Sequence, residues 1–212
     1  MMEHWTEYSR FFIALFVILD PFAAVPIFLA LTKTYSDSER GHIANVSAIT
    51  VLLVLVVASL SGETLLNTMG TSLASFRVGG GIVLLLMAIA MLNGQTGSLR
   101  TTPEEEAEAE DRNAIAVVPL AIPLMAGPGS ISTVIIQMQR SDTEYHNLLV
   151  IFSILLVCLL LWIVLRLAST IGKVLGHIGL NIINRLFGLI LAAIAVEIMA
   201  NGLKQLFPVL AG

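Results

Sequence analysis

The sequence has few charged residues and a single cysteine. Asp, Glu, Lys and Arg together make up 12% of the 212 residues, whereas 57% are hydrophobic, a composition outside the usual range of globular domains. Cys158 has no second cysteine in the chain, which excludes an intrachain disulfide. The basic residues form no patch or stripe of the kind that binds nucleic acid. We therefore expect a chain built for a lipid environment, with no nucleic-acid partner.

Sequence motifs of enzyme catalysis are also missing. The chain contains no nucleophile elbow, no phosphate-binding P-loop and no two-cysteine motif. Its four histidines, His4, His42, His146 and His177, have no spacing suited to a metal. The sequence therefore predicts no enzymatic activity, no cofactor and no metal site.

Long apolar runs dominate what the sequence does contain. About 20 apolar residues form a helix that crosses the roughly 30 Å of hydrocarbon in a bilayer. Six runs come near or exceed this length, at Tyr8 to Leu31, Ile43 to Leu60, Leu73 to Leu92, Ala114 to Met138, Leu148 to Leu167 and Ile182 to Leu206. The predicted fold class is an all-α membrane protein with six transmembrane helices.

The basic residues predict how these helices are oriented. If the N-terminus is outside, seven of the eleven Lys and Arg residues fall on the cytoplasmic side: Lys33, Arg40, Arg100, Arg112, Arg166, Lys173 and Arg185. Cytoplasmic loops carry such an excess. We expect a multi-pass protein of the bacterial inner membrane with both termini outside, and with the acidic run Glu104 to Asp111 in a cytoplasmic linker.

The third and sixth apolar runs repeat a pattern of residues. Each member of the first set recurs 108 positions later: Arg77, Gly80, Ile82, Met91, Asn93 and Gly94 become Arg185, Gly188, Ile190, Met199, Asn201 and Gly202. At nearly the same offset, Gly127-Pro128 follows Asp20-Pro21. Three spans per copy is an odd number, so the second copy would enter the membrane upside down, as in many secondary transporters. We predict inverted three-helix repeats at residues 1–94 and 114–212, joined by the acidic linker 95–113.

The first and fourth spans are predicted to be broken helices. Asp20-Pro21 lies near the middle of one run, and proline cannot donate a backbone hydrogen bond there. The fourth run holds Pro119, Pro123 and Gly127-Pro128-Gly129. Because proline suits the first turn of a helix, each X-Pro step predicts the start of a half-helix inside the bilayer. Prolines can also be simple kinks, and this alternative applies most to Pro26, Pro119 and Pro123.

The two breaks predict a site for a small zwitterion. Asp20 can offer a carboxylate to an ammonium group, whereas free amides at the start of the fourth span's half-helix can hold an anion. The predicted substrate-binding residues are Asp20, Pro21, Ala23, Ala24, Gly127, Pro128, Gly129, Ser130, Ser132 and Thr133. Small residues at the breaks favour a small substrate. Ser132 and Thr133 are equally compatible with bonding back to carbonyls one turn earlier.

Three segments closely resemble the MarC family of bacterial inner-membrane proteins. They run from Asp20 to Phe28, from Gly79 to Leu85 and from Val118 to Pro128, and the last has the sequence VPLAIPLMAGP. The resemblance implies six transmembrane helices and, by similarity to the SnatA-type branch, transport of small neutral amino acids such as glycine, alanine, serine or threonine. Asn-Pro is common in the family where this chain has Asp20-Pro21, so the charge of Asp20 departs from the family pattern.

The predicted function is therefore a secondary transporter of small neutral amino acids that works by alternating access. Coupling to H⁺ or Na⁺ is left open, membrane lipid is an expected partner, and a homo-oligomer is compatible with the sequence. Two alternatives remain. The protein could instead export larger apolar compounds, or it could be a membrane assembly or partner-binding protein that uses the acidic linker.

Overall fold

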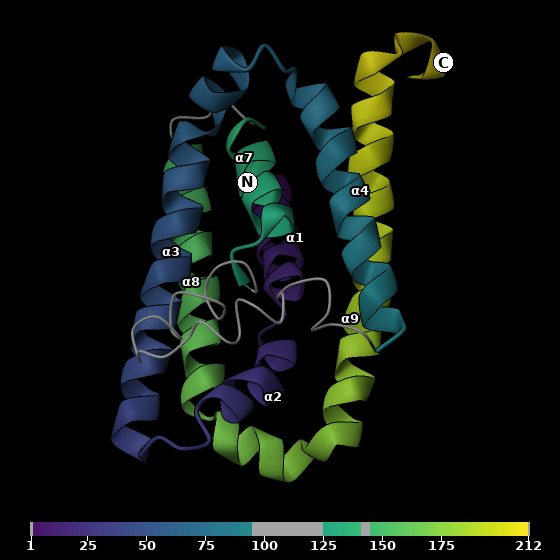
Figure 1. The fold of residues 1–212 in the computed structure, drawn as a ribbon. Helices are drawn as coiled ribbons and strands as arrows, with labels where there is room; N and C mark the ends of the chain where they lie inside the picture. The colour runs from purple at the N-terminus through teal and green to yellow at the C-terminus, as the bar shows by residue number, and fades with distance from the viewer. Residues whose placement is uncertain (1, 95–124, 141–144, 212) are drawn as a thin grey trace.

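The computed structural model describes residues 2–94, 125–140 and 145–211. Within these ranges all regular secondary structure is helical, and there is no strand (Figure 1). The helices are α1 (Met2–Leu19), α2 (Pro21–Leu31), α3 (Asp37–Thr68), α4 (Leu73–Leu92), α7 (Pro128–Met138), α8 (His146–Arg166) and α9 (Ala168–Leu206), followed by the short 3₁₀ helix η2 (Pro208–Ala211). The all-α fold class is thus confirmed for the described part of the chain.

Five helical stretches of the described residues are long and apolar enough to cross a membrane. They are Thr6–Leu31, Asp37–Gly62, Leu73–Leu92, His146–Arg166 and Ala168–Leu206. The predicted fourth span is described only from residue 125 onward. Pro119, Pro123 and the predicted acidic linker lie outside the described residues.

The helices form two outer pairs with a group of shorter helices between them (Figure 1). In one pair α3 packs against α8, and in the other α4 packs against α9. The helices α1, α2 and α7 lie between the pairs and contact both of them. The middle of the bundle is therefore built from the segments that contain the two X-Pro steps.

The pair of α4 and α9 is held together through glycines. A Cβ atom added at Gly202 would lie 2.8 Å from the backbone oxygen of Ala74, and one added at Gly188 would lie 3.1 Å from that of Ala88. Gly81 likewise faces the backbone oxygen of Ala195 at 3.0 Å from its ideal Cβ position. Partner numbers fall along α9 as they rise along α4, so the helices run antiparallel with their backbones in close contact.

Two helices are longer than the hydropathy pattern predicts. The helix α3 begins at Asp37 because Ser36 and Glu39 form a capping box, in which the Ser36 N–H donates to Glu39 Oε2 at 2.8 Å. The helix α9 begins at Ala168 rather than at Ile182, and it bends at Gly176, whose φ of 58° and ψ of −176° interrupt the helical backbone. Its first turns run across one end of the bundle (Figure 1).

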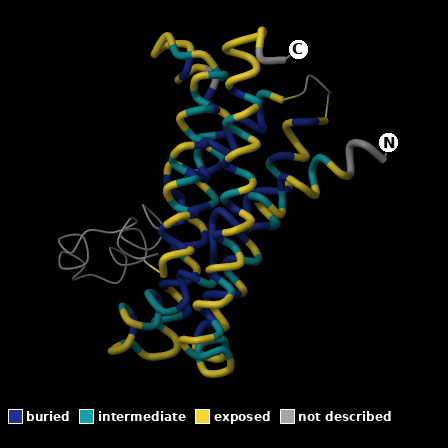
Figure 2. The backbone as a smooth tube through the Cα atoms, turned by 90° about the vertical axis from the view of Figure 1, so that its right-hand side faces the viewer, coloured by how far each residue is buried: buried dark blue, intermediate teal, exposed yellow. Residues whose placement is uncertain are grey.

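Large apolar side chains cover the outside of the bundle. Ile49, Leu53 and Val57 on α3 are each more than half exposed, and they recur at the four-residue spacing of one helix face. Buried positions alternate with exposed ones along the long helices (Figure 2). This pattern fits helices that meet lipid on one side and protein on the other.

Candidate functional site

The first helix break lies at Asp20, near the middle of the candidate span Thr6–Leu31. Pro21 lacks a backbone N–H and disfavours helical backbone in the residue before it. Asp20 accordingly adopts a left-handed conformation, with φ 44° and ψ 66°, and α2 starts at Pro21. Its Oδ1 accepts a hydrogen bond from the Ala23 N–H at 3.2 Å. The prediction that a new helix begins at Pro21, capped by Asp20, is confirmed.

The carboxylate of Asp20 lies deep in the protein. Its side chain is 0% exposed, and Ala23 and Ala24 in the first turn of α2 are 2% and 0% exposed. An aspartate at the centre of a membrane helix costs about 2.5 to 3.5 kcal/mol on insertion scales. The helix cap offsets part of that cost, since it places a backbone donor against the carboxylate. Pro26, by contrast, sits within α2 and does not end it.

Three phenyl rings surround this break, a feature that sequence reasoning missed. Phe16 precedes Asp20 and Phe22 follows it, and their ring centroids are 6.3 Å apart. Phe187 of α9 lies 6.0 Å from Phe16 and 5.9 Å from Phe22, and all three contacts are edge-to-face. Such geometry is the favoured one for aromatic pairs. The rings thus tie both sides of the break to α9, and no sequence signal marks Phe187 for this role.

The second break lies at Gly127-Pro128. Gly127 has extended backbone, and α7 starts at Pro128 without any side-chain cap. A Cβ added at Gly129 would lie 2.7 Å from Leu84 Cδ2 and 3.6 Å from Ile18 Cγ2. Because Ile18 is two residues before Asp20, the start of α7 packs beside the first break. The predicted helix start at Pro128 is confirmed, whereas the part of the predicted span before residue 125 lies outside the described residues.

The three predicted hydroxyl groups are buried and bonded to the backbone. Ser130 Oγ donates to the carbonyl oxygens of Met125 at 3.1 Å and Gly127 at 3.0 Å. Ser132 Oγ and Thr133 Oγ1 both donate to the Gly129 carbonyl, at 3.0 Å and 2.8 Å. The bonding back to earlier carbonyls, considered above as an alternative, is therefore what this conformation shows. The hydroxyl oxygens keep lone pairs that can accept a hydrogen bond.

The helices that follow the two breaks match in length and in their first residue, but the breaks differ in backbone conformation and in chemistry. The half-helices α2 and α7 are both 11 residues long and both begin with proline. One carries a buried carboxylate at its start, whereas the other presents an uncapped helix N-terminus, which attracts anions. No group of three or more His, Cys, Asp or Glu residues in the described ranges could hold a metal ion.

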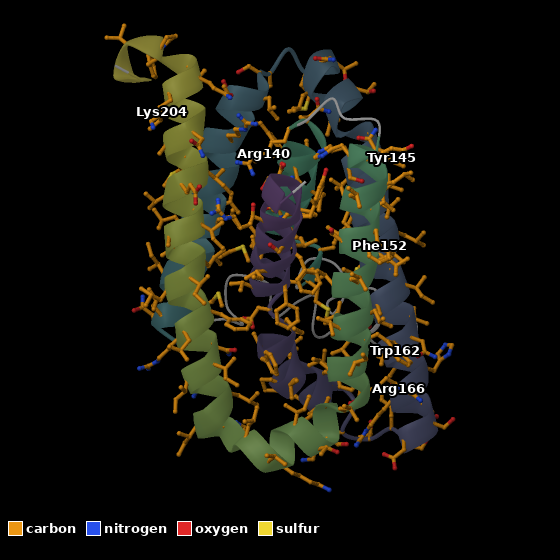
Figure 3. All side chains as sticks on the ribbon, turned by 180° about the vertical axis from the view of Figure 1, so that it is seen from behind. Arg140, Tyr145, Phe152, Trp162, Arg166 and Lys204 are labelled. Atoms are coloured by element: carbon orange, nitrogen blue, oxygen red, sulfur yellow. The ribbon has the colours of Figure 1, made fainter. Side chains whose placement is uncertain are left out.

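A polar network pins three helices together at the end of the bundle away from α2. The buried His146 of α8 bonds through Nδ1 to the Tyr8 hydroxyl of α1 at 2.8 Å, and through Nε2 to the Gln137 carbonyl of α7, also at 2.8 Å. Gln137 Nε2 in turn donates to Glu7 Oε1 at 3.0 Å. Arg140, labelled in Figure 3, donates to Gln137 Oε1 at 3.5 Å. The C-terminal end of α7 is thereby fixed to α1 and α8.

Comparisons with known proteins cover nearly the whole chain. Residues 5–207 match the model of the MarC family integral membrane proteins. The chain is 35% identical to the UPF0056 membrane protein YhcE of Escherichia coli, over 95% of this chain and 94% of that protein. It is 39% identical to a UPF0056 membrane protein of Methanocaldococcus jannaschii, over 91% and 94% of the two chains. No solved structure matches the chain.

Proposed function

The chain belongs to the MarC family of integral membrane proteins, and from that premise we propose that it is a secondary carrier of small neutral amino acids. The substrates would be of the glycine, alanine, serine and threonine class, moved by alternating access around the two helix breaks. The observation that carries the proposal is the pair of 11-residue half-helices, each of which starts at an X-Pro step within the apolar bundle.

Half-helices of this kind suit the binding of a zwitterion. Backbone groups freed at a helix break are tolerated in a membrane only where protein or a water-lined cavity satisfies them. Asp20 supplies a negative charge for an ammonium group, and the uncapped amides of Gly129 and Ser130 suit a carboxylate. A Cβ at Gly129 would lie 3.6 Å from Ile18, two residues before Asp20, and this proximity supports one site that uses both groups.

The packing of the helices supports the inverted repeat that such a carrier needs. The half-helix α2 packs on α9, and its counterpart α7 packs on α4, so each half-helix contacts the third span of the other copy. In the seam, Gly81 faces Met199 and Gly188 faces Met91. Met91 and Met199 are counterparts in the repeat, and Gly188 corresponds to Gly80, one residue before Gly81. These near-reciprocal contacts support two copies related by an approximate two-fold axis.

The size of the residues at the breaks favours a small substrate. Ala23 and Ala24 are fully packed, and a single added methyl at Gly129 would already clash with Leu84. Asp20 is completely buried in this conformation. A carrier would therefore have to open this region to each side of the membrane in turn, which is the essence of alternating access.

Uptake into proteoliposomes tests the proposal. We expect saturable uptake of labelled glycine or alanine by the wild-type protein, measured with and without a proton or sodium gradient to identify the coupling ion. Asp20→Ala should abolish uptake, whereas Asp20→Asn, the residue common in the family, keeps an oxygen at the helix cap and shows at unchanged stability how much of the uptake depends on the charge. The matched control is Asp37→Asn, which removes an exposed acid far from the breaks. No uptake of any small amino acid under any gradient would refute the proposal.

Two further experiments test the alternative functions. An exporter of larger apolar compounds would leave amino acid uptake absent and raise drug accumulation in a deletion strain. A partner-binding protein would lose function when Glu104 to Asp111 are deleted, whereas a carrier would hardly change. We place the protein in the cytoplasmic membrane with both termini outside, and a C-terminal alkaline phosphatase fusion should then be active.

A further inference from the structure

A groove opens at the end of the bundle where α2 ends. It consists of two adjoining cavities of about 380 Å³ and 450 Å³, which share Leu29, Arg40 and Ser169. Four elements enclose it: the last turns of α2, the start of α3, the end of α8 and the first turns of α9. Neither cavity is lined by Asp20 or Gly127, so the groove is separate from the helix breaks.

The rim of the groove is positively charged. Arg40, Arg166 and Lys173 line it, against the single acid Asp37. Asp37 is exposed and lies 3.9 Å from Arg40, which also donates to the Thr32 carbonyl at 3.0 Å. Within the described ranges, neither Arg166 nor Lys173 forms an ion pair. Arg166 and Lys173 can therefore each contribute a positive charge to an anionic ligand.

Arg166 is held at the rim by specific contacts. Its guanidinium carbon lies 5.7 Å from the centroid of the Trp162 ring, within cation–π range. The Trp162 Nε1 donates to Asn45 Oδ1 on α3 at 2.7 Å, which fixes the ring. A Cβ at Gly41 would overlap the guanidinium, so glycine is needed for Arg166 to lie there. Figure 3 shows Trp162 and Arg166 together at the lower end of α8.

The wall of the groove is apolar and continues to the outer surface. Pro26, Leu29 and Leu180 line its inner side. Beside it, Val174 and Ile178 flank the bend in α9 and are each 78% exposed. Exposed apolar side chains next to basic ones at the end of a membrane bundle are typical of a segment that lies at the lipid interface.

We propose that this groove binds an anionic phospholipid, with the phosphate between Arg166 and Lys173 and an acyl chain along the apolar wall. Basic pockets between membrane helices bind anionic lipid headgroups, and guanidinium groups form strong charge-assisted bonds to phosphate. A soluble phosphate would gain nothing from the apolar lining of Pro26, Leu29 and Leu180, which is why the lipid is the better fit. The proposal is independent of the substrate that the protein carries.

Native mass spectrometry of the purified full-length protein tests this assignment. Phosphatidylglycerol and phosphatidylcholine with the same acyl chains are titrated into the detergent-solubilised protein. We expect the wild type to prefer phosphatidylglycerol, and the Arg166→Gln, Lys173→Gln double variant to bind it roughly fivefold more weakly for each charge removed. The matched control is Arg10→Gln with Lys204→Gln, two exposed cations that line neither cavity; Lys204 lies at the opposite end of the bundle (Figure 3).

A variant that keeps the net charge sharpens the test. Gly41→Ala should push the Arg166 guanidinium out of its position and weaken phosphatidylglycerol binding, while the unfolding temperature stays near that of the wild type. Equal binding of both lipids by the wild type would overturn the assignment, even if a variant failed to fold. So would equal losses in the control pair and the groove pair, or displacement of the lipid by millimolar glycerol 3-phosphate, which would indicate a soluble anion site.

Discussion

Substitutions of Asp20 can separate three roles of this residue: helix cap, left-handed backbone and buried charge. Asp20→Ala removes the oxygen that accepts from the Ala23 N–H, and loss of such a cap costs about 0.5 to 2 kcal/mol. Alanine also has no side-chain bond to compensate for φ 44°, ψ 66°, a region that costs residues with a Cβ about 1 to 2 kcal/mol. Part of that cost is already present in the wild type.

The expected order of stability follows from these magnitudes. Asp20→Asn keeps both the cap oxygen and a residue type that tolerates left-handed backbone, so it should lie within about 0.5 kcal/mol of the wild type. Asp20→Ala should lose about 1 to 2 kcal/mol. Asp20→Gly should be more stable than the alanine variant, because glycine adopts the left-handed region without steric cost.

Thermal unfolding of the purified variants in one detergent measures this order. With about 2 to 4 °C per kcal/mol for a chain of this size, the alanine variant should melt roughly 2 to 8 °C below the asparagine variant. Equal melting temperatures for the two would show that neither the cap nor the backbone conformation matters, and the reasoning about the first break would be wrong. The asparagine variant, if stable, then reports on the charge alone in the uptake assay.

Three further predictions concern stability and use the same thermal unfolding measurement. Gly202→Ala forces a methyl group against the Ala74 backbone and should lower the free energy of unfolding by about 1 to 3 kcal/mol. Gly79→Ala, which has nothing within 4 Å of the added methyl, should raise it by up to about 1 kcal/mol. Equal effects of the two substitutions would contradict the close α4–α9 contact. Gly176→Ala has open space for the added methyl, so a loss of about 1 to 3 kcal/mol in the free energy of unfolding would come from backbone strain alone. An unchanged melting temperature would contradict the positive φ at this bend. His146→Phe leaves the Tyr8 hydroxyl and the Gln137 carbonyl without their hydrogen-bond partner and should lower the free energy of unfolding by about 1 to 3 kcal/mol. An unchanged melting temperature would show that this network does not hold the three helices together.

Local chemistry made the two breaks predictable from the sequence. Proline restricts both its own backbone and that of the preceding residue, so Asp20-Pro21 and Gly127-Pro128 fix where α2 and α7 begin whatever surrounds them. The capping role of Asp20 follows from the same short segment. The repeat singles out Gly188 and Gly202 but does not predict the close α4–α9 contact that both residues make.

Other features could not be predicted, because they depend on contacts between residues far apart in the sequence or lie in helical segments whose hydropathy is typical of loops. The first turns of α9 hold Ser169, Lys173 and His177, and this polar content resembles a loop although the segment is helical and lies at one end of the bundle. The phenyl contact of Phe187 with Phe22 joins residues 165 positions apart, so no local pattern reveals it. Trp162 and Arg166 are neighbours one turn apart on α8, but the hydrogen bond that fixes the Trp162 ring needs Asn45 of α3 in place beside α8.

The different ways in which the helices are joined indicate where a carrier of this fold would move. The helices α4 and α9 meet backbone to backbone at Gly81, Gly188 and Gly202, and packed contacts of that kind leave little freedom to slide. The half-helices α2 and α7 instead join their neighbours at residues where the helical hydrogen-bond ladder is already interrupted. Pro21 and Pro128 have no N–H to lose, so bending there costs fewer backbone hydrogen bonds than bending a continuous helix. If the protein transports a substrate, the α4–α9 seam should therefore act as the fixed spine, and the two breaks, of which only the first carries an acid, should be the hinges.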